Sequence, residues 1–287
     1  MINLKYNKII LKLSSLLLAL SAVFLCSCSI NIEQPSKPTN GEIRVTVLDV
    51  GQGDSIFIEL TDNRCMLIDA GEYEYGDDIA EYIRSSGYNK IDYLVATHPH
   101  ADHIGGMSEI IGSFDIGEIY MPRASTDTRT FEQLLTAIDD KGMSINTARA
   151  GVSILSEDNL SIDILAPVSD SYTDLNNYSS VIKLTYGEVK FLFMGDAEKE
   201  SESEITADVS ADFVKVGHHG SKTSSSADFV ERVGASYAAV SVAEENEYNL
   251  PVKKIINRWK NSGADVLMTK DVGDITAVSD GKTLWIE

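Results

Sequence analysis

The order of apolar and polar residues predicts a chain of short strands with helices between them. Strands are indicated by runs of branched apolar residues that alternate with polar residues or lie between turn residues. Helices are indicated where apolar residues recur every three or four positions. These criteria predict strands over 43–50, 56–60, 65–68, 91–96, 119–121, 145–147, 160–165, 181–186, 189–194, 213–216, 237–242, 266–268, 275–278 and 283–286. They predict helices over 77–86, 107–111, 131–141, 198–205 and 252–261, and a further helix that ends over 229–233.

The predicted strands come in runs, with helices between the runs and no long linker. The chain has no internal repeat and no low-complexity stretch, which favours one compact unit. We therefore expect residues 41–287 to form a single domain of the mixed α/β (α+β) class. Two sheets that pack face to face with helices on their outer faces, an αββα sandwich, accommodate this order of elements.

The first 40 residues differ from the rest and indicate export. A positively charged start is followed by an almost wholly apolar run over 13–25, which is typical of a secretory signal and shorter than the roughly 20 residues of a membrane span. The next residues, Leu-Cys-Ser-Cys ending at Cys28, resemble the bacterial lipoprotein cleavage box. We expect a signal peptide over 1–27, a lipid on Cys28 that anchors the chain outside the cytoplasmic membrane or at an outer membrane, and a polar tether over 28–40. An uncleaved signal anchor is the alternative.

The composition of the chain predicts a sizeable core and a strongly negative net charge. Apolar residues make up 43% of the chain, enough for a sizeable core. The formal net charge is -20, and loss of the lysines in the signal peptide makes the mature chain more negative still. Such a charge repels nucleic acid and anionic membranes at long range, so a polyanionic substrate would need metal ions and a local cationic patch. We attribute the acidity to the solubility of an exported protein and predict no protein partner.

One cysteine lies in the predicted domain. Cys65 belongs to the apolar run over 64–68, where a cysteine is usually a small buried hydrophobe. A single cysteine provides no disulfide framework, so the fold is expected to rest on its core alone.

The segment richest in potential metal ligands follows the strand predicted over 91–96. Residues 97–103 read Thr-His-Pro-His-Ala-Asp-His, so three imidazoles and a carboxylate fall within six positions. On a loop, the first two histidines can point one way and the following aspartate and histidine another, which suits two neighbouring metal ions. These ligand types favour zinc or manganese. All five histidines of the chain lie in this motif or in a second pair, which argues against chance. The histidines and the aspartate are His98, His100, Asp102, His103, His218 and His219.

The HxHxDH pattern resembles the signature of the metallo-beta-lactamase superfamily. Other segments line up with motifs of that superfamily along almost all of residues 41–287. They are Leu67-Ile68-Asp69-Ala70-Gly71, Leu192-Phe193-Met194-Gly195-Asp196 and Lys215-Val216-Gly217-His218-His219-Gly220-Ser221. Further segments resemble the ComEC type, the soluble domain of a DNA-uptake channel and its free-standing relatives. These segments are residues 48–54, 176–181 and 218–224.

The resemblance implies two metal ions with Asp196 as a bridge between them. A hydroxide held between the ions would be the nucleophile, so Asp102 and Asp196 are the residues expected in catalysis. The ligands implied for the first metal are His98 and His100, and those implied for the second are Asp102, His103 and one of His218 and His219. The sequence does not choose between the last two histidines.

Other residues are expected to support this site. Asp69 would orient a ligand histidine, although a strand-end turn also favours aspartate. The same turn alternative applies to Asp196, but a buried strand delivers Asp196 to the same sheet edge. The glycine-rich turn that ends at Asp54 would approach the substrate closely, or it is a plain hairpin turn. Ser221 and Lys222 would bind a phosphate, unless Lys222 is only a solvated surface residue.

Two departures from the family pattern affect the expected activity. Many members have another histidine before the bridging aspartate, whereas Asn177 and Ser179 lie near that place here, so the first metal ion would lack one protein ligand and be more labile. ComEC-type chains usually carry Asn-x-Tyr-Gly-His-Pro where residues 246–251 read Asn-Glu-Tyr-Asn-Leu-Pro. Leu250 can neither contact the scissile phosphate nor protonate the leaving group, and loss of one such acid typically costs about 100- to 10,000-fold in rate.

The predicted function is a metal-dependent phosphodiesterase or nuclease that acts outside the cytoplasmic membrane with two divalent ions, zinc or manganese. Leu250 favours a smaller substrate or one with a better leaving group. A hydrolase of another ester, such as a phosphocholine ester or a lactone, is therefore the first alternative. A non-catalytic metal-binding lipoprotein is the second.

Overall fold

A computed structural model describes residues 41–287 of the chain. The predicted signal peptide over 1–27, the tether over 28–40 and the lipidation site at Cys28 lie outside the described residues. Within residues 41–287, none of the helices combines the length and the apolar character that crossing a membrane requires.

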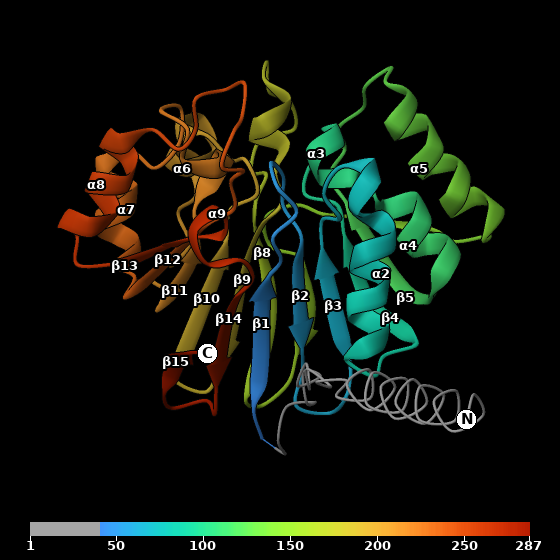
Figure 1. Cartoon of the computed structure of the whole chain (residues 1–287), viewed down its shortest axis with the longest axis horizontal. Helices are drawn as coiled ribbons and strands as arrows, with labels where there is room; N and C mark the ends of the chain where they lie inside the picture. The colour runs from blue at the N-terminus through green and yellow to red at the C-terminus, as the bar shows by residue number, and fades with distance from the viewer. Residues whose placement is uncertain (1–40) are drawn as a thin grey trace, which may run out of the picture. The chain divides into compact units, whose positions relative to one another are not determined.

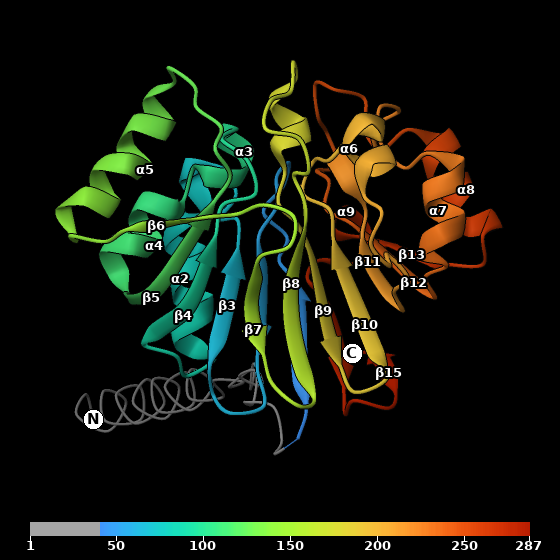
Figure 2. The ribbon, with the colours of Figure 1, turned by 180° about the vertical axis from the view of Figure 1, so that it is seen from behind.

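Two β-sheets form the centre of the domain (Figures 1 and 2). The first sheet has the strand order β15-β14-β1-β2-β3-β4-β5-β6, and the second has the order β13-β12-β11-β10-β9-β8-β7. The strands of the first sheet are β1 (Ile43–Val47), β2 (Ile56–Glu59), β3 (Cys65–Ile68), β4 (Lys90–Val95), β5 (Asp115–Met121), β6 (Ile145–Thr147), β14 (Ile275–Ser279) and β15 (Leu284–Ile286). Those of the second are β7 (Ser153–Ser156), β8 (Leu160–Ala166), β9 (Val181–Tyr186), β10 (Val189–Phe193), β11 (Phe213–Lys215), β12 (Tyr237–Val240) and β13 (Asp265–Met268).

Helices cover the outer face of each sheet (Figure 1). The helices beside the first sheet are α2 (Gly76–Ser85), α4 (Met107–Ser113) and α5 (Arg129–Asp140), and those beside the second are α6 (Lys199–Glu204), α7 (Ala227–Val233) and α8 (Lys253–Asn261). Single turns complete the chain at α3 (Ala101–Ile104), α9 (Thr269–Val272), η1 (Tyr73–Tyr75), η2 (Leu175–Tyr178) and η3 (Gly217–Gly220). The predicted αββα sandwich is therefore confirmed.

Buried apolar side chains form three layers that correspond to this architecture. One layer lies between the two sheets, and the other two lie between each sheet and its helices. Along β8, Leu160, Ile162 and Ile164 are buried while Ser161 and Asp163 are partly exposed, as expected for a strand with one face toward the core. Strand β10 has apolar neighbours on both faces, and its apolar positions are all buried.

Local sequence sets the beginning of two outer helices. The hydroxyl oxygen of Thr128 accepts a hydrogen bond from the backbone N–H of Phe131 at the start of α5. Ser226 caps α7 in the same way, and α7 ends at Gly234 in the left-handed conformation that glycine adopts without strain. These caps fix the residue at which each helix begins.

Parallel strands bring the candidate residues to one edge of the sandwich. Strands β3, β4 and β5 are parallel in the first sheet, and β10 to β13 are parallel in the second. Asp69 follows β3, the histidine motif over 97–103 follows β4, Asp196 follows β10, and the pair over 218–219 follows β11. Sites in open α/β sheets form at these carboxyl ends, so the topology collects the candidate ligands.

Several elements differ from the sequence-based expectation. Strand β7 was not predicted, because only its two central residues are buried and the segment shows no alternation. The single turns α3 and α9 are too short for a helical period to be visible. Strand β5 begins at Asp115 rather than at residue 119, because its first half is largely exposed. Strand β1 ends at Val47 rather than at residue 50, and α8 begins at Lys253 because Val252, the N-cap residue, has an extended backbone.

Candidate metal centre

The first two histidines of the motif lie in the loop that follows β4, where the backbone of His100 is extended. His98 is buried, and its Nε2 atom lies 2.9 Å from Nδ1 of His100. Burial holds the pKa of His98 well below its usual value, so its imidazole is neutral, the form that binds metal. The prediction of a loop holds for these two residues. Asp102 and His103 lie instead in the helical turn α3, and the ring of His103 packs against that of His98 with centroids 4.2 Å apart.

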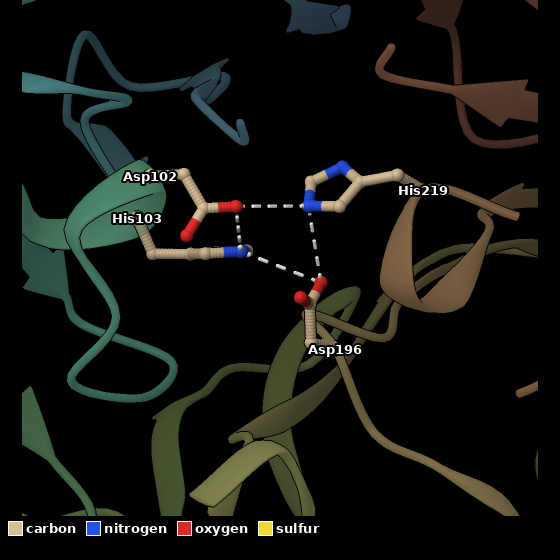
Figure 3. A group of neighbouring side chains, drawn as sticks. All are labelled: Asp102, His103, Asp196 and His219. Atoms are coloured by element: carbon tan, nitrogen blue, oxygen red, sulfur yellow. Dashed lines mark ion pairs between the residues drawn. The ribbon is translucent and has the colours of Figure 1, made fainter. Parts of the chain in front are cut away.

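Four side chains from three parts of the chain meet at the centre of the site (Figure 3). Nε2 of His103 lies 3.4 Å from Oδ1 of Asp196, and Nε2 of His219 lies 3.5 Å from the same oxygen. Oδ2 of Asp102 lies 3.6 Å from Nε2 of His103 and 3.3 Å from Nε2 of His219. One donor atom from each of the four residues lies within 4.8 Å of all the others, which is close enough for a single ion to contact all of them.

Three of these donor atoms are buried without a hydrogen bond. They are Nε2 of His103, Nε2 of His219 and Oδ1 of Asp196, and none of them has a hydrogen-bond partner among the described residues. Buried polar atoms normally find such a partner, because an unsatisfied one costs about 1–3 kcal/mol. The converging imidazole nitrogens and carboxylate oxygens suit a divalent transition-metal ion. The residues present therefore fit the metal that the sequence motif implies.

The two oxygens of Asp196 face different candidate ligands. Oδ1 faces His103 and His219, as described above, whereas Oδ2 lies 3.9 Å from Nε2 of His98 and 3.7 Å from Nε2 of His218. The backbone N–H of Asp196 donates to the hydroxyl of Ser179 (3.0 Å), which holds the aspartate in place. This geometry is what a bridging carboxylate requires.

The histidine pair lies in an irregular turn. His218 (φ 50°, ψ 48°) and His219 (φ 50°, ψ 28°) both adopt left-handed backbone conformations within η3. Two successive residues other than glycine in this region are uncommon and cost conformational energy. Of the two, His219 belongs to the four-residue cluster, while His218 lies on the other side of Asp196.

Asp69 contacts the histidine motif from behind. Its carboxylate accepts hydrogen bonds from the backbone N–H (2.8 Å) and the hydroxyl (2.6 Å) of Thr97, and it lies 2.7 Å from Nδ1 of His103. Asp69 is fully buried and has a left-handed φ of 58°. A carboxylate on the far nitrogen of a histidine fixes the orientation of the ring and directs Nε2 forward. The contact is the one that sequence analysis expected of Asp69, whose role in metal binding remains a prediction.

A buried ion pair lies behind His219. Nζ of Lys215 donates to Oδ2 of Asp54 (2.7 Å) and to the carbonyl oxygen of Val216 (3.0 Å), and both charged side chains are at most 1% exposed. Oδ1 of Asp54 lies 3.5 Å from Nδ1 of His219, which also faces the carbonyl oxygen of Ser241 at 3.0 Å. Sequence analysis did not assign a role to Lys215. The signal was available, since a lysine within an apolar strand has to bury its charge.

The glycine-rich turn before Asp54 connects β1 to β2 and passes close to α3. The backbone N–H of Asp54 donates to the carbonyl oxygen of Asp102 (3.1 Å). A Cβ atom on Gly53 would lie 2.4 Å from that same oxygen, so only glycine allows the approach. The turn joins a hairpin, as one alternative stated, and it also positions the backbone of a candidate ligand.

The side chains of Asn177 and Ser179 make hydrogen bonds to other groups of the protein. The side-chain oxygen of Asn177 accepts from the backbone N–H groups of Glu198 (3.1 Å) and Ser201 (3.3 Å), and its amide nitrogen donates to Glu200 (3.3 Å). The hydroxyl of Ser179 accepts from Asp196. Both residues therefore contact the segment around Asp196, and the supporting role expected of them remains a prediction.

The carboxylates favour positive charge in the cluster. Burial disfavours the charged form of His103, but Asp196 and Asp102 outweigh it and raise the pKa of this imidazole well above its usual value. Burial also opposes the charged form of His219, whose pKa is raised by Asp196 and Asp54. Despite burial, His219 and His103 hold the pKa of Asp196 well below its usual range. A site that stabilises cationic imidazoles suits a metal cation, which competes with protons for the same nitrogen atoms.

A cavity of about 330 Å³ opens onto these ligands. Its described lining includes His100, Asp102, Asp196, His218 and His219, together with Gln52, Glu72, Ala101, Asn176, Tyr248 and Leu250. Leu250 thus lies at the cavity wall, where the ComEC-type pattern has a histidine. Ser221 and Lys222 are not among the lining residues, and the hydroxyl of Ser221 contacts that of Thr223 at 2.9 Å. Their predicted part in phosphate binding gains no support from this placement.

Comparisons with known proteins agree with this geometry. The family model described as metallo-beta-lactamase superfamily matches residues 48–243. The chain is 28% identical over 261 residues to ComE operon protein 3 of Bacillus subtilis (strain 168), a match that covers 84% of this chain and 33% of that protein. It is 27% identical over 253 residues to competence protein ComA of Neisseria gonorrhoeae, with 86% and 34% covered. The chain thus spans about a third of the length of the curated relatives it matches.

Solved structures show the same fold at lower sequence identity. Igni18, a metallo hydrolase from the archaeon Ignicoccus hospitalis KIN4/I, superposes with a TM-score of 0.51 at 14% identity. The match covers 82% of this chain and 98% of that one. Identity at this level is informative about the arrangement of the sheets and helices alone.

Proposed function

Because the chain belongs to the metallo-beta-lactamase superfamily, whose members are generally hydrolases, we propose that it is a metal-dependent phosphodiesterase. The proposed substrates are phosphodiesters, with nucleic acid among them. The observation that carries the proposal is the group of buried donor atoms without hydrogen bonds that converge at a cavity. The resemblance to the ComEC-type domains of DNA-uptake channels favours a phosphodiester as the scissile group.

We propose two divalent ions, zinc or manganese, with Asp196 between them. Asp102, His103 and His219 would hold one ion. When bound, such ions lower the pKa of a coordinated water and neutralise charge on the phosphodiester oxygens. The protein supplies the fixed geometry, because Asp69 and the carbonyl oxygen of Ser241 occupy the far nitrogens of His103 and His219 and keep both Nε2 atoms directed into the cluster.

The strong negative charge limits which phosphodiesters fit best. A net charge of -20 repels a long polyanion, and this repulsion weakens as salt screens it. We therefore expect small activated diesters and short oligonucleotides to be better substrates than long duplex DNA at low ionic strength. Added salt should narrow that difference.

We further propose that a lipid on Cys28 holds the domain at the outer side of the cytoplasmic membrane or at an outer membrane. Support comes from the apolar segment and the cleavage-box resemblance in the sequence. Labelling of cells with a radioactive fatty acid should mark the wild-type chain and not Cys28→Ala. Equal labelling of the two chains would refute the assignment.

The direct test of activity is hydrolysis of bis-p-nitrophenyl phosphate by the full chain, purified in detergent and loaded with manganese or zinc. Asp102→Asn removes one ligand charge and should lower kcat/KM by more than the roughly 100-fold that loss of a residue behind a metal ligand costs. The matched control is Asp265→Asn, the same chemical change at an exposed position at the start of β13. This control should keep wild-type activity and the same thermal transition.

Equal rates for wild type and Asp102→Asn would mean that the diester is not cleaved at this site. The position of Leu250 in the cavity wall then favours a second candidate, the hydrolysis of another ester such as a phosphocholine ester or a lactone. A panel of small esters, assayed with the same two variants, distinguishes the candidates. Metal binding without turnover of any ester would leave a non-catalytic metal-binding lipoprotein.

A further inference from the structure

A groove of about 800 Å³ lies between α7 and α8, which pack side by side on the outer face of the second sheet (Figures 1 and 2). None of its described lining residues also lines the metal cavity. We propose that this groove binds the phosphodiester backbone of a single-stranded nucleic acid whose scissile linkage lies in the metal cavity. The inference rests on the proposed phosphodiesterase function and adds a substrate-binding surface outside the metal centre.

Helix α8 and its C-cap present two rows of hydrogen-bond donors to the groove. The lining residues of each row recur at intervals of four, so each row follows one face of the helix. One row is Lys253, Asn257 and Asn261, and the other is Lys254, Arg258 and Ser262. All six side chains can donate a hydrogen bond, and none carries a negative charge. At 1.5 Å per residue a row is about 12 Å long, which is the length of about three to four nucleotides at a spacing of roughly 3.4 Å.

The cations of the groove have no carboxylate partner among the described residues. The chain has 44 acidic and 24 basic residues, yet α8 carries four bases and no acid. Lys253 and Lys254 are exposed and form no ion pair within residues 41–287. Arg258 donates to the carbonyl oxygen of Ser225, which holds its guanidinium in place and leaves other N–H groups for a ligand. A single exposed lysine is usually only solvated, but three cations in one groove, opposed there by Glu231 alone among the described lining residues, favour a polyanion.

Helix α8 begins beside the metal centre. The backbone N–H of Val252, the N-cap of α8, donates to the carbonyl oxygen of Gly220 (3.0 Å), the residue that follows His219. Leu250 lies in the wall of the metal cavity, and three residues of chain place the Cα atom of Lys253 at most about 11 Å from that of Leu250. A strand with one linkage in the cavity therefore reaches the first lysine of α8 within a few nucleotides.

An exposed aromatic ring lies at the metal cavity on the side of α8. Tyr248 lines the cavity and is nevertheless 70% exposed. Proteins that bind single strands combine a cationic groove with aromatic rings on which the bases stack. Three exposed glutamates precede this tyrosine, at Glu244, Glu245 and Glu247, whereas the cations follow it in α8. The change in the sign of the charge directs a polyanion from the ring toward α8.

The shape and the apolar residues of α8 favour a strand over an anionic membrane. A helix that lies on a bilayer inserts an apolar face between the lipids and surrounds it with lysine and arginine. The apolar residues Ile255, Ile256 and Trp259 of α8 are instead buried within the domain. The cations line a concave surface, which can enclose a strand but cannot follow a flat bilayer.

The test measures binding of a fluorescein-labelled thymidine oligonucleotide of about 12 residues by fluorescence anisotropy. The full chain is used in a neutral detergent, with a chelator present so that the strand is not cleaved. The double variant Lys253→Gln with Lys254→Gln should weaken binding by about 10-fold at low salt. The slope of log K against log salt concentration should become less steep by about 1.4, because each lost phosphate contact of a single strand contributes about 0.7.

The matched control is Lys90→Gln with Lys282→Gln, which removes the same charge elsewhere. Lys90 begins β4 and Lys282 lies in the turn between β14 and β15, so both are at the end of the sandwich away from the metal cavity (Figure 1). Both side chains are exposed. This variant should keep the affinity and the salt dependence of the wild type, because the net charge is altered equally and only the position differs.

Two further measurements separate binding in the groove from damage to the fold. Glu231→Gln removes the carboxylate from the groove and should tighten binding of the oligonucleotide, which a misfolded protein would not do. Tyr248→Ala should weaken binding by roughly 5- to 150-fold without a change in the salt slope, because stacking releases no counterions. Tyr248→Phe keeps the ring and should bind as the wild type does.

The outcomes distinguish this inference from the proposed function. Equal affinity and equal salt slope in the wild type and the double lysine variant of α8 would overturn the groove assignment, and so would an equal loss in the control variant. Lysine-dependent binding to phosphatidylglycerol vesicles, with no binding of the oligonucleotide, would overturn it in favour of a membrane surface. If the oligonucleotide binds as expected but no diester is cleaved, the proposed function fails and the groove assignment stands.

Discussion

The buried pair of Asp54 and Lys215 gives the sharpest test of the structural reasoning. Both side chains are at most 1% exposed, and the lysine makes two hydrogen bonds, one to the carboxylate and one to the carbonyl oxygen of Val216. Lys215→Met keeps most of the packing volume but leaves Asp54 as a buried charge without its partner. Removal of one member of a buried pair typically costs about 3–5 kcal/mol of unfolding free energy, because the desolvated charge is no longer compensated.

The double variant Asp54→Asn with Lys215→Met should be more stable than Lys215→Met alone. Asparagine is nearly isosteric with aspartate and carries no charge, so the double variant has neither buried charge. Replacement of a whole buried pair by uncharged residues is often close to neutral. The two substitutions should therefore be strongly non-additive in a double-mutant cycle, as expected for residues in direct contact.

Urea unfolding at pH 7, monitored by fluorescence, measures these differences. Trp259 on α8 is fully buried and reports loss of the core beside the second sheet, and far-ultraviolet circular dichroism checks that the transition is two-state. A chelator must be present throughout, since metal at 100 times its dissociation constant adds about 2.7 kcal/mol to any variant that still binds it.

A cost below about 1 kcal/mol for Lys215→Met would refute the reasoning, because an exposed pair contributes no more than that. Strict additivity of the two substitutions would refute it equally. In that case the pair would have to be hydrated in solution, and its contact with His219 could not be regarded as fixed.

Three further predictions concern the site. Asp69→Asn should weaken the affinity for the second metal ion by about 10- to 100-fold in a calorimetric titration, because His103 loses the carboxylate behind its ring. In chelated protein the pKa values of His103 and His219 are raised, so protonation of these imidazoles stabilises the fold. This stabilisation is complete below the pKa of an unfolded histidine and is lost as the pH rises, so the temperature of the thermal transition should fall from pH 6 toward higher pH. Saturating metal should abolish this dependence on pH. Leu250→His should raise kcat/KM for an oligonucleotide by up to about 100-fold and should raise kcat/KM for bis-p-nitrophenyl phosphate less, because an added acid helps a poor leaving group most. The ratio of the two kcat/KM values, compared between the variant and the wild type, measures this preference.

The fold could be predicted from the sequence where an element is long enough to show a period. The strand over 181–186 has the predicted limits, and the helix beginning at Arg129 differs by two residues or fewer at each end. Strand β7 could not be predicted, because its central Ile154 and Leu155 are flanked by exposed serines and form no alternating run. Its pairing with β8 depends on tertiary contacts that no local pattern contains.

The site could be predicted as a set of residues but not as an arrangement. Clustering of every histidine in two motifs identified the ligand types, yet His218 and His219 are adjacent in the chain and chemically identical. Only their left-handed backbone conformations separate them onto the two sides of Asp196. Lys215 was missed because lysine is usually a surface residue. Its position in an apolar strand indicated burial, but its partner Asp54 is distant in the sequence and is identified only by the structure.

The supporting contacts and the cavity wall lie on opposite sides of the ligands, and this separation has a functional consequence. Asp69 and the Asp54–Lys215 pair hold the histidines from the buried side, whereas Leu250 and Tyr248 line the cavity and contact none of these buried groups through a hydrogen bond. A change at the wall therefore alters what the cavity accepts without loosening the ligands. We therefore expect the leucine at position 250 to affect the choice of substrate and the protonation of the leaving group, and to leave metal binding intact. Metal counts and turnover consequently report on two independent parts of the site.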